Sequence, residues 1–157
     1  GIRVTFFLVG ECIDGNEDLV KQMAKDGHLI GVHCMTHKDL TKEKLSDAAK
    51  ELWAAREKIR AVTGTLPEYV RPPYGNWNAK LEEAVDMIPA FWDVDSIDWR
   101  LKNTEKVTAK VVKDTEDGDI ILMHDEFKTS VEAAFRIIDN LTAKGYTFVT
   151  VDELMVD

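Results

Sequence analysis

A pair of histidines is the first feature of this sequence that could do chemistry. His33 and His37 lie four residues apart in the segment HCMTH, at the end of a predicted strand, Leu29–His33. Two imidazoles at this spacing can bind one divalent metal ion if the chain between them turns or coils once. The same spacing occurs in solvated histidine pairs, and the interval alone favours that interpretation. The position at the end of a strand favours a metal site instead.

A proline-rich loop, RPPYG at residues 71–75, follows the predicted strand Tyr69–Arg71. Its two prolines stiffen the backbone, and Gly75 permits a tight turn. A rigid loop can hold a backbone N–H toward a developing oxyanion, and the Arg71 guanidinium can pair with a carboxylate through two hydrogen bonds. A purely structural turn explains the pentapeptide equally well.

A carboxylate and a histidine follow two further predicted strands, Ala90–Asp95 and Asp119–His124. Asp98 and Trp99 belong to the segment DSIDW, and His124 ends the segment LMH. A carboxylate there can bind metal or shift the pKa of a histidine, and an indole can stack on a sugar. Near a metal and an Asp, His124 would be a candidate general acid. Taken singly, solvated acids and a hydrogen-bonded core histidine are the more common interpretations.

Short strands alternating with helices must position these residues. The candidate strands are rich in Val, Ile and Phe and suit a sheet covered on both faces: Ile2–Val9, Leu29–His33, Tyr69–Arg71, Ala90–Asp95, Asp119–His124 and Thr147–Val151. The alternation predicts a parallel sheet with right-handed crossovers, either a barrel or an open doubly wound sheet. In both folds the C-terminal ends of the strands form the active face, where these motifs lie.

Helical patterns fill the gaps between the strands. Asn16 is expected to cap a helix that Gly27 ends, and a longer helix is expected from about Thr41 to Thr63, with Gly64 as its C-cap. The residues expected to face inward are Leu19, Val20, Met23 and Ala24 in the first helix and Leu45, Ala48, Ala49, Leu52, Ala55, Ile59 and Val62 in the second. Further helices are predicted at Ala79–Ile88, Thr104–Thr115 and Ser130–Lys144.

Composition narrows the class of protein. The 157 residues predict one domain, and Lys+Arg 20 against Asp+Glu 29 gives a net charge of −9. A nucleic-acid partner is not expected, because such proteins carry a basic face. No apolar run approaches the roughly 20 residues of a membrane span. Strand counting suggests a missing element at the front, because a barrel beginning at Ile2 would have a gap with unpaired backbone edges.

The motifs, taken in order, resemble the polysaccharide deacetylase family with the NodB homology domain, carbohydrate esterase family 4. HCMTH resembles its metal-binding motif, although Cys34 replaces the usual Ser or Thr, and RPPYG, DSIDW and LMH match three further motifs. The flanking segments VTFFLVG, DGHLIGVH and GYTFVTVDEL agree as well. The family's first motif, TFDDGP, is not in this sequence. The resemblance implies a distorted (β/α) barrel lacking its first strand, in a NodB homology domain at 1–157 that is incomplete at its N-terminus.

The resemblance also implies a set of roles. His33 and His37 would hold a divalent metal ion, with Zn²⁺ the first candidate and Co²⁺, Ni²⁺ or Mn²⁺ as alternatives. The absent motif would supply the base Asp and a third ligand. The remaining roles fall on residues of this chain: Arg71 would hold the base, the Tyr74 N–H would stabilise the oxyanion, His124 with Asp98 would protonate the amine, and Trp99, Leu122 and Pro73 would contact the substrate.

The implied reaction is deacetylation of N-acetylglucosamine in peptidoglycan or chitin-like chains, by an exported or cell-surface protein. The chain alone is expected to be poorly active, so a separate N-terminal segment that completes the barrel is a possible partner. Deacetylation of acetylated xylan and a non-catalytic carbohydrate-binding protein are the alternatives. Outside the cytoplasm, Cys12 and Cys34 could also form a disulfide.

Overall fold

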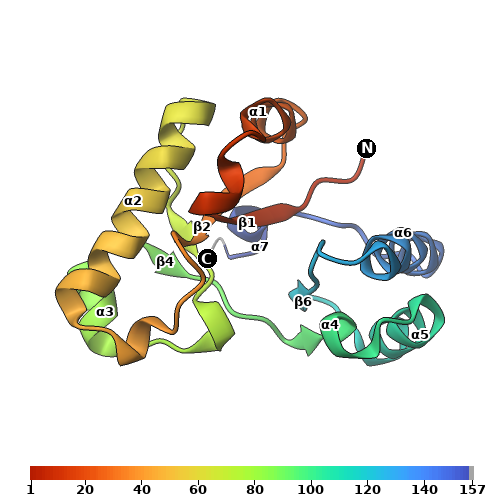
Figure 1. Ribbon diagram of the computed structural model, residues 1–157. Coiled ribbons are helices and arrows are strands. Elements are labelled where there is room, and N and C mark those ends of the chain that lie inside the picture. Colours follow the sequence, from red (N-terminus) through yellow and green to blue (C-terminus); the bar gives the residue numbers. More distant parts are fainter. Residues whose placement is uncertain (156–157) are drawn as a thin grey trace. The chain divides into compact units, whose positions relative to one another are not determined.

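The computed structural model describes residues 1–155. The chain divides into two compact units (Figure 1). Unit 1 comprises Gly1–Phe91 together with the residues from Val149 onward, and unit 2 comprises Trp92–Phe148. Within the described residues, no helix is both long and apolar enough to cross a membrane.

Unit 1 is built on a four-stranded parallel sheet. Its strands β1 (Thr5–Val9), β2 (Leu29–Cys34), β3 (Tyr69–Val70) and β4 (Ile88–Pro89) are hydrogen-bonded in chain order. The β1–β2 register runs from Thr5 opposite Leu29 and shifts after Leu8. All neighbouring pairs are parallel, so each crossover brings the chain back to the same edge, and the loops after β2 and β3 leave from that edge.

Helices connect these strands: α1 (Glu17–Lys25), α2 (Leu45–Thr63) and α3 (Ala79–Ala84), with 3₁₀ turns η1 (Gly10–Ile13), η2 (Leu40–Lys42) and η3 (Pro73–Gly75). Helix α2 packs on β2 and buries Ala48, Leu52, Ala55 and Ile59 completely. Gly64 ends it in the left-handed conformation that glycine tolerates, with its N–H bonded to the Arg60 carbonyl. Burying a side chain such as Leu52 contributes about 1.5–3 kcal/mol, which fixes the helix under the loops described below.

Unit 2 has a two-stranded parallel sheet, β5 (Val94–Asp95) and β6 (Ile121–Leu122). Its helices are α4 (Asp98–Leu101), α5 (Thr104–Asp114) and α6 (Lys128–Ala143), and α5 and α6 lie side by side (Figure 1). The core between them consists of Val94, Val107, Val111, Ala133, Ile137 and Leu141. This core holds β5 and β6 in place, and the catalytic candidates of the unit follow these two strands.

Most predicted elements are confirmed, and several expectations are wrong. Asn16 occupies the N-cap position of α1 but does not cap it, because its side-chain amide donates to the Cys12 carbonyl instead. Helix α2 begins at Leu45 and not near Thr41, which lies in η2. The predicted strand Thr147–Val151 does not form, because Thr150 and Glu153 make a capping box that starts helix α7 (Val151–Leu154). The predicted strand Ala90–Asp95 is replaced by two short strands, β4 and β5, in different sheets. Helix α3 ends at Ala84 and not at Ile88, because Val85 is already extended.

Two residues expected to face inward are exposed. Leu19 is 57% exposed and Leu45 is 43% exposed. The buried stripe of α1 is centred on Val20, and Leu45 is the first residue of α2, before that helix reaches the core. Both predictions counted apolar residues at the edge of a helical face as part of its centre.

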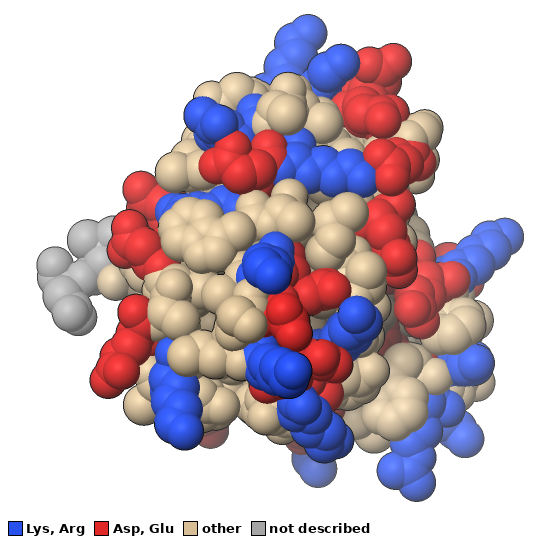
Figure 2. Space-filling view, turned by 60° about the vertical axis from the view of Figure 1, so that its left-hand side comes forward, with Lys and Arg blue, Asp and Glu red and all other residues tan. Residues whose placement is uncertain are grey.

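The surface carries charges of both signs. On the face shown in Figure 2, Lys and Arg side chains are interspersed with Asp and Glu, and no continuous basic stripe crosses this view.

Candidate active site

His33 lies near the end of β2 with its tautomer fixed by the backbone. Its Nδ1 lies 2.5 Å from the carbonyl oxygen of Arg71. A carbonyl oxygen only accepts, so Nδ1 must carry the proton, and the lone pair of the neutral ring is on Nε2. Metal-binding histidines commonly donate their second ring N–H to a backbone carbonyl in this way.

His37 ends the turn that follows β2. Its ring contacts that of His33 edge-on, with 4.8 Å between centroids, and that of Tyr74 at 5.0 Å. Its backbone is left-handed, with φ 53°, a conformation that costs a non-glycine residue roughly 1–3 kcal/mol. The surrounding loop must therefore hold it, and the His37 N–H donates to the Cys34 Sγ at 2.9 Å.

The segment between the two histidines is anchored at further points. The Thr36 N–H and hydroxyl both donate to the Glu51 carboxylate on α2 at 2.9 Å. The Met35 carbonyl accepts the Glu11 N–H at 3.0 Å, and a side chain at Gly10 would collide with the Met35 sulfur. The HCMTH turn is therefore held by both η1 and α2.

Cys34 is buried within this turn and does not pair with Cys12. Both cysteines are free in the structure, so the possible disulfide does not form. Burial raises the pKa of the Cys34 thiol to about 11. At neutral pH Cys34 is a packed thiol and not a thiolate metal ligand.

The RPPYG loop contacts the histidine turn within unit 1. Tyr74 adopts φ 61° and is 64% exposed, and its hydroxyl donates to the His37 carbonyl at 3.4 Å. Pro73 is buried at the start of η3. A second link joins the Asn76 amide to the Asp39 carboxylate at 2.9 Å. The pKa of Asp39 falls to about 2, because Thr41, Lys42 and Asn76 donate to its carboxylate. The two loops are thus tied together beside the histidines.

Arg71 is buried at the base of this loop. Its guanidinium donates to the Ala90 and Phe91 carbonyls at 3.2 Å each and lies over the Phe7 ring at 4.4 Å. Burial lowers the pKa of Arg71 to about 10, so the group stays charged at neutral pH. Its backbone carbonyl also orients His33, so one residue connects the proline loop to the histidine pair.

The histidine pair fits a metal ion in ligand type, tautomer and proximity. Two imidazoles from one turn are typical nitrogen ligands for Zn²⁺ and related ions. Among the described residues, no group of three or more His, Cys, Asp or Glu side chains forms a metal-binding cluster. The chain therefore supplies two candidate ligands, and a third is not placed beside them.

In unit 2, the buried Asp98 and the partly exposed His124 form a hydrogen-bonded pair. The His124 Nδ1 lies 2.7 Å from Asp98 Oδ1, and the His124 backbone N–H donates to Oδ2 at 2.9 Å. Asp98 is fully buried and accepts a further bond from the Trp99 N–H at 2.9 Å. The His124 side chain is 37% exposed, so one end of its ring is held and the other end lies toward solvent.

This pairing shifts both groups toward their charged forms. Burial alone would raise the pKa of Asp98, but the hydrogen bonds from the His124 side chain and backbone outweigh it and lower the pKa to about 2. The hydrogen bond that the His124 ring donates to Asp98 raises the pKa of His124 against the opposing effect of burial. A histidine held charged by a carboxylate is suited to donate a proton.

The strands β5 and β6 place this pair. Asp95 lies opposite Leu122, and the Ser96 N–H donates to the Leu122 carbonyl at 3.2 Å, which brings Asp98 and His124 to the same edge. Ile97 turns the chain in a left-handed conformation, φ 48°, with its N–H bonded to Asp95. Leu122 is buried, and Trp99 is half exposed beside Asp98.

The structure thus brings the predicted residues together in two groups, one in each unit. His33, His37, Arg71, Pro73 and Tyr74 gather in unit 1, and Asp98, Trp99, Leu122 and His124 gather in unit 2. Sequence reasoning missed Glu51 and the Asp39–Asn76 link. Glu51 had a signal, because it follows Ala48 by three residues and precedes Ala55 by four, at the edge of the buried face of α2. The Asp39–Asn76 hydrogen bond joins two loops, and no sequence pattern could have predicted it.

Comparisons with known proteins agree with these motifs. The family model for polysaccharide deacetylase matches residues 1–89. The chain is 35% identical over 153 residues to the peptidoglycan-N-acetylglucosamine deacetylase PgdA of Listeria monocytogenes, covering 98% of this chain and 33% of that protein. It is 37% identical over 152 residues to the peptidoglycan-N-acetylmuramic acid deacetylase PdaC of Bacillus subtilis, and the match covers 97% of this chain and 32% of that protein. The chain therefore spans about a third of the length of these relatives.

Solved structures give the same fold. The structure of PdaC from Bacillus subtilis superposes with a TM-score of 0.94 at 36% identity and covers 97% of this chain and 75% of that chain. A carbohydrate esterase family 4 pseudoenzyme from Bacillus anthracis superposes with a TM-score of 0.91 at 25% identity. The match covers 99% of this chain and 56% of that chain. The predicted NodB-type α/β fold is confirmed, and the chain belongs to the polysaccharide deacetylase family.

Proposed function

We propose that this chain provides most of the active site of a metal-dependent deacetylase acting on N-acetylated sugars of peptidoglycan. The observation that carries the proposal is the His33–His37 contact, with the His33 tautomer set by the Arg71 carbonyl. That arrangement brings two imidazoles together for one cation, with the His33 ring oriented by a backbone carbonyl. Membership of the deacetylase family supports the hydrolysis of an acetyl group as the reaction.

His33 and His37 would hold the metal ion, with Zn²⁺ the first candidate. A bound divalent cation would supply a Lewis acid for the acetyl carbonyl and make a water molecule more acidic. No third ligand stands with the pair among residues 1–155, and the TFDDGP motif is not in the sequence. We infer that a segment carrying this motif supplies a third ligand and the general base.

The remaining steps use residues of this chain. The Tyr74 N–H would donate to the oxyanion that forms on the acetyl carbonyl, and the buried charge of Arg71 would orient the carboxylate of the base. His124, held in its protonated form by Asp98, would transfer its proton to the amine as the C–N bond breaks. Trp99, Leu122 and Pro73 would contact the substrate.

The substrate proposal rests on the relatives. PgdA is named for N-acetylglucosamine and PdaC for N-acetylmuramic acid, both in peptidoglycan. N-acetylglucosamine in peptidoglycan is our first candidate, with chitin-like chains next, and such substrates place the protein outside the cell or at its surface. A pocket of about 400 Å³ supports a glycan ligand, because it lies next to Tyr74 and is lined by Asp39, Thr41, Lys42, Gly75, Asn76, Trp77 and Asn78.

A non-catalytic binding protein is the second candidate. Two observations favour it: the histidine pair lacks a third ligand among the described residues, and a structural neighbour is a pseudoenzyme. Under this proposal the chain would bind peptidoglycan fragments without releasing acetate.

Acetate release with and without the missing motif separates these functions. The chain is assayed alone, and again extended by a segment bearing TFDDGP, on peptidoglycan fragments, chitooligosaccharides and acetylated xylan. We expect about 10²–10⁴-fold faster release from the extended chain, because general base catalysis contributes that factor. Replacing the first Asp of the added motif should spare metal binding, and replacing the second should weaken it. Substrate binding with no acetate from either form would favour the binding protein, and xylan as the best substrate would correct the substrate class.

A further inference from the structure

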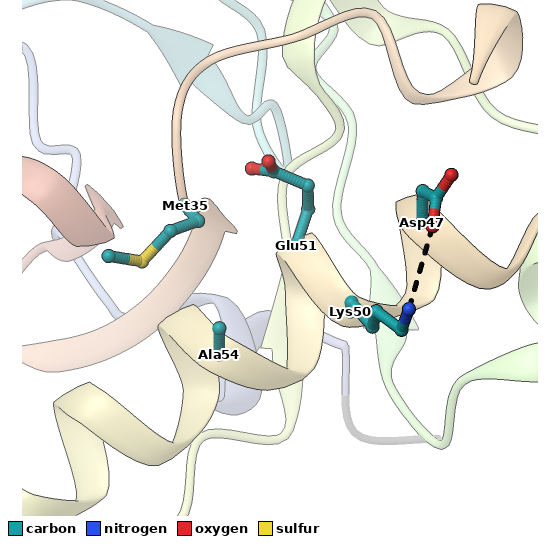
Figure 3. Close-up of a pocket in the computed structure, with 5 residues that line it drawn as sticks. All are labelled: Met35, Asp47, Lys50, Glu51 and Ala54. Atoms are coloured by element: carbon teal, nitrogen blue, oxygen red, sulfur yellow. Dashed lines mark ion pairs between the residues drawn. The ribbon is translucent and has the colours of Figure 1, made fainter. Parts of the chain in front are cut away.

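Glu51 lies on α2, outside the groups that the mechanism uses. Its Oε2 accepts the Thr36 N–H and the Thr36 hydroxyl, each at 2.9 Å, and its Oε1 lies 3.1 Å from the same hydroxyl. Lys38 adds an ion pair at 3.4 Å. Figure 3 shows the Glu51 carboxylate rising from α2 toward the chain that leaves Met35, whereas Asp47 and Lys50 pair with each other farther along the helix.

The hydrogen bonds from Thr36 to Glu51 hold the residue that directly precedes His37. The His37 backbone is left-handed, and its own N–H is held by the neutral Cys34 sulfur, a weak acceptor. The Glu51 oxygen is the stronger acceptor of the two, and it takes two donors from Thr36, each at 2.9 Å. The Glu51 side chain is 16% exposed, so water competes poorly for the carboxylate. Its helix is anchored by the core of unit 1, so the carboxylate is a fixed point for the turn.

We propose that Glu51 is a positioning residue that holds the His33–His37 turn in the geometry that binds metal. The proposal rests on the metal site of the proposed function and deepens it. Glu51 acts through its hydrogen bonds to Thr36 and not through the attraction of a nearby carboxylate for a cation. These two explanations predict different behaviour for a glutamine, which keeps an acceptor oxygen but removes the charge.

The test measures Zn²⁺ affinity of the full 157-residue chain by competition with a chromophoric chelator. Glu51→Ala should weaken binding about 10–100-fold, the usual effect of removing a partner behind a metal ligand. Glu51→Gln should stay close to the wild type, because its carbonyl oxygen can accept both Thr36 donors. Thr36→Val should lie between the two, since it loses the hydroxyl and keeps the N–H. Glu57→Ala is the matched control, because Glu57 is an exposed glutamate on the same helix and pairs with Arg60.

Amide hydrogen exchange of the metal-free chain gives a second readout. Glu51→Ala should speed exchange at Thr36 and His37, whereas Glu51→Gln and Glu57→Ala should not. Wild-type Zn²⁺ affinity retained in Glu51→Ala would overturn the positioning role, as would an equal loss in Glu51→Gln and Glu51→Ala. A wild-type chain that binds no Zn²⁺ would instead refute the metal site, and unchanged exchange at His37 in Glu51→Ala would then overturn the role of Glu51 on its own.

Discussion

His33 and His124 show how the partner of one ring nitrogen decides what a histidine can do. Both rings are oriented through Nδ1, His33 by the Arg71 carbonyl and His124 by the Asp98 carboxylate. A carbonyl fixes the tautomer of a neutral ring and leaves its lone pair on Nε2, as a metal ligand requires. A carboxylate stabilises the charged ring and raises its pKa, as a proton donor requires. The same residue type is therefore prepared for two different tasks.

The two regions also differ in how they are built. In unit 1 a 19-residue helix and a four-stranded sheet hold the turn, because its backbone N–H groups donate to the side chains of Glu51 and Cys34. In unit 2 two-residue strands suffice, because Asp98 itself accepts bonds from His124 and Trp99 and organises the backbone around it. The proposed ligand pair, His33 and His37, depends on the elements around it. The Asp98–His124 pair instead organises much of its own surroundings through the bonds that Asp98 accepts. Mutations should therefore separate metal binding from proton transfer.

The largest effect is expected from removing the histidine pair. The double variant His33→Ala/His37→Ala should lose the single bound divalent ion and nearly all deacetylase activity of a completed domain, because it removes both imidazoles that we propose as ligands of this chain. Metal content after dialysis and acetate release measure the two losses. His28→Ala is the control, since His28 accepts the Val4 N–H and packs on Phe6, away from the pair. Unchanged metal content in the double variant would contradict the ligand assignment.

The sequence predicted which residues gather in the two units better than it predicted the elements and backbone conformations that hold them. The sequence places HCMTH, RPPYG, DSIDW and LMH at the ends of strands, and the structure confirms that they lie at the C-terminal ends of β2, β3, β5 and β6. Periodicity alone could not show that Thr150 would cap a helix, or that one apolar run would be divided between two sheets. Nor could it reveal the left-handed backbones of His37, Tyr74 and Ile97, because hydrophobic periodicity indicates which side chains are buried and not the φ of a single loop residue.

The second effect tests the proton donor. In a completed domain, His124→Ala should lower kcat by about 10²–10⁴-fold while leaving metal content unchanged, because the ring serves the leaving amine and not the ion. Truncation removes the side-chain partner of buried Asp98, so His124→Asn, which keeps a donor, serves as the folding control. Thermal unfolding of both variants verifies that the fold is retained. Loss of metal together with activity would make His124 a ligand and remove the difference between the two histidines.

The smallest effect concerns the pH dependence of stability, and it belongs to unit 2. The Asp98 pKa is lowered from 3.8 to about 2, so its contribution is present above pH ~4 and is lost as the pH falls toward 2. The His124 pKa is raised, so its contribution is present below its unfolded value of 6.5 and is lost as the pH rises through the folded value. Stabilisation by the pair should therefore be greatest between about pH 4 and 6.5.

Asp98→Asn removes the pH-dependent stabilisation by both Asp98 and His124, so comparing this variant with the wild type measures it. The Asp98 shift corresponds to roughly 2 kcal/mol, and a domain of this size changes its Tm by roughly 2–4 °C for each kcal/mol. The Tm gap between wild type and Asp98→Asn should thus be widest near pH 5 and narrow by several degrees toward pH 2. Asn also turns a donor toward His124, which adds a loss at every pH, so only the pH-dependent part of the gap tests the pair. Asp117→Asn, an exposed position in the same unit, should show no such change. A gap that stays constant from pH 2 to 6 would mean that Asp98 is not held ionised by His124, and the contrast between the two histidines would then rest on geometry alone.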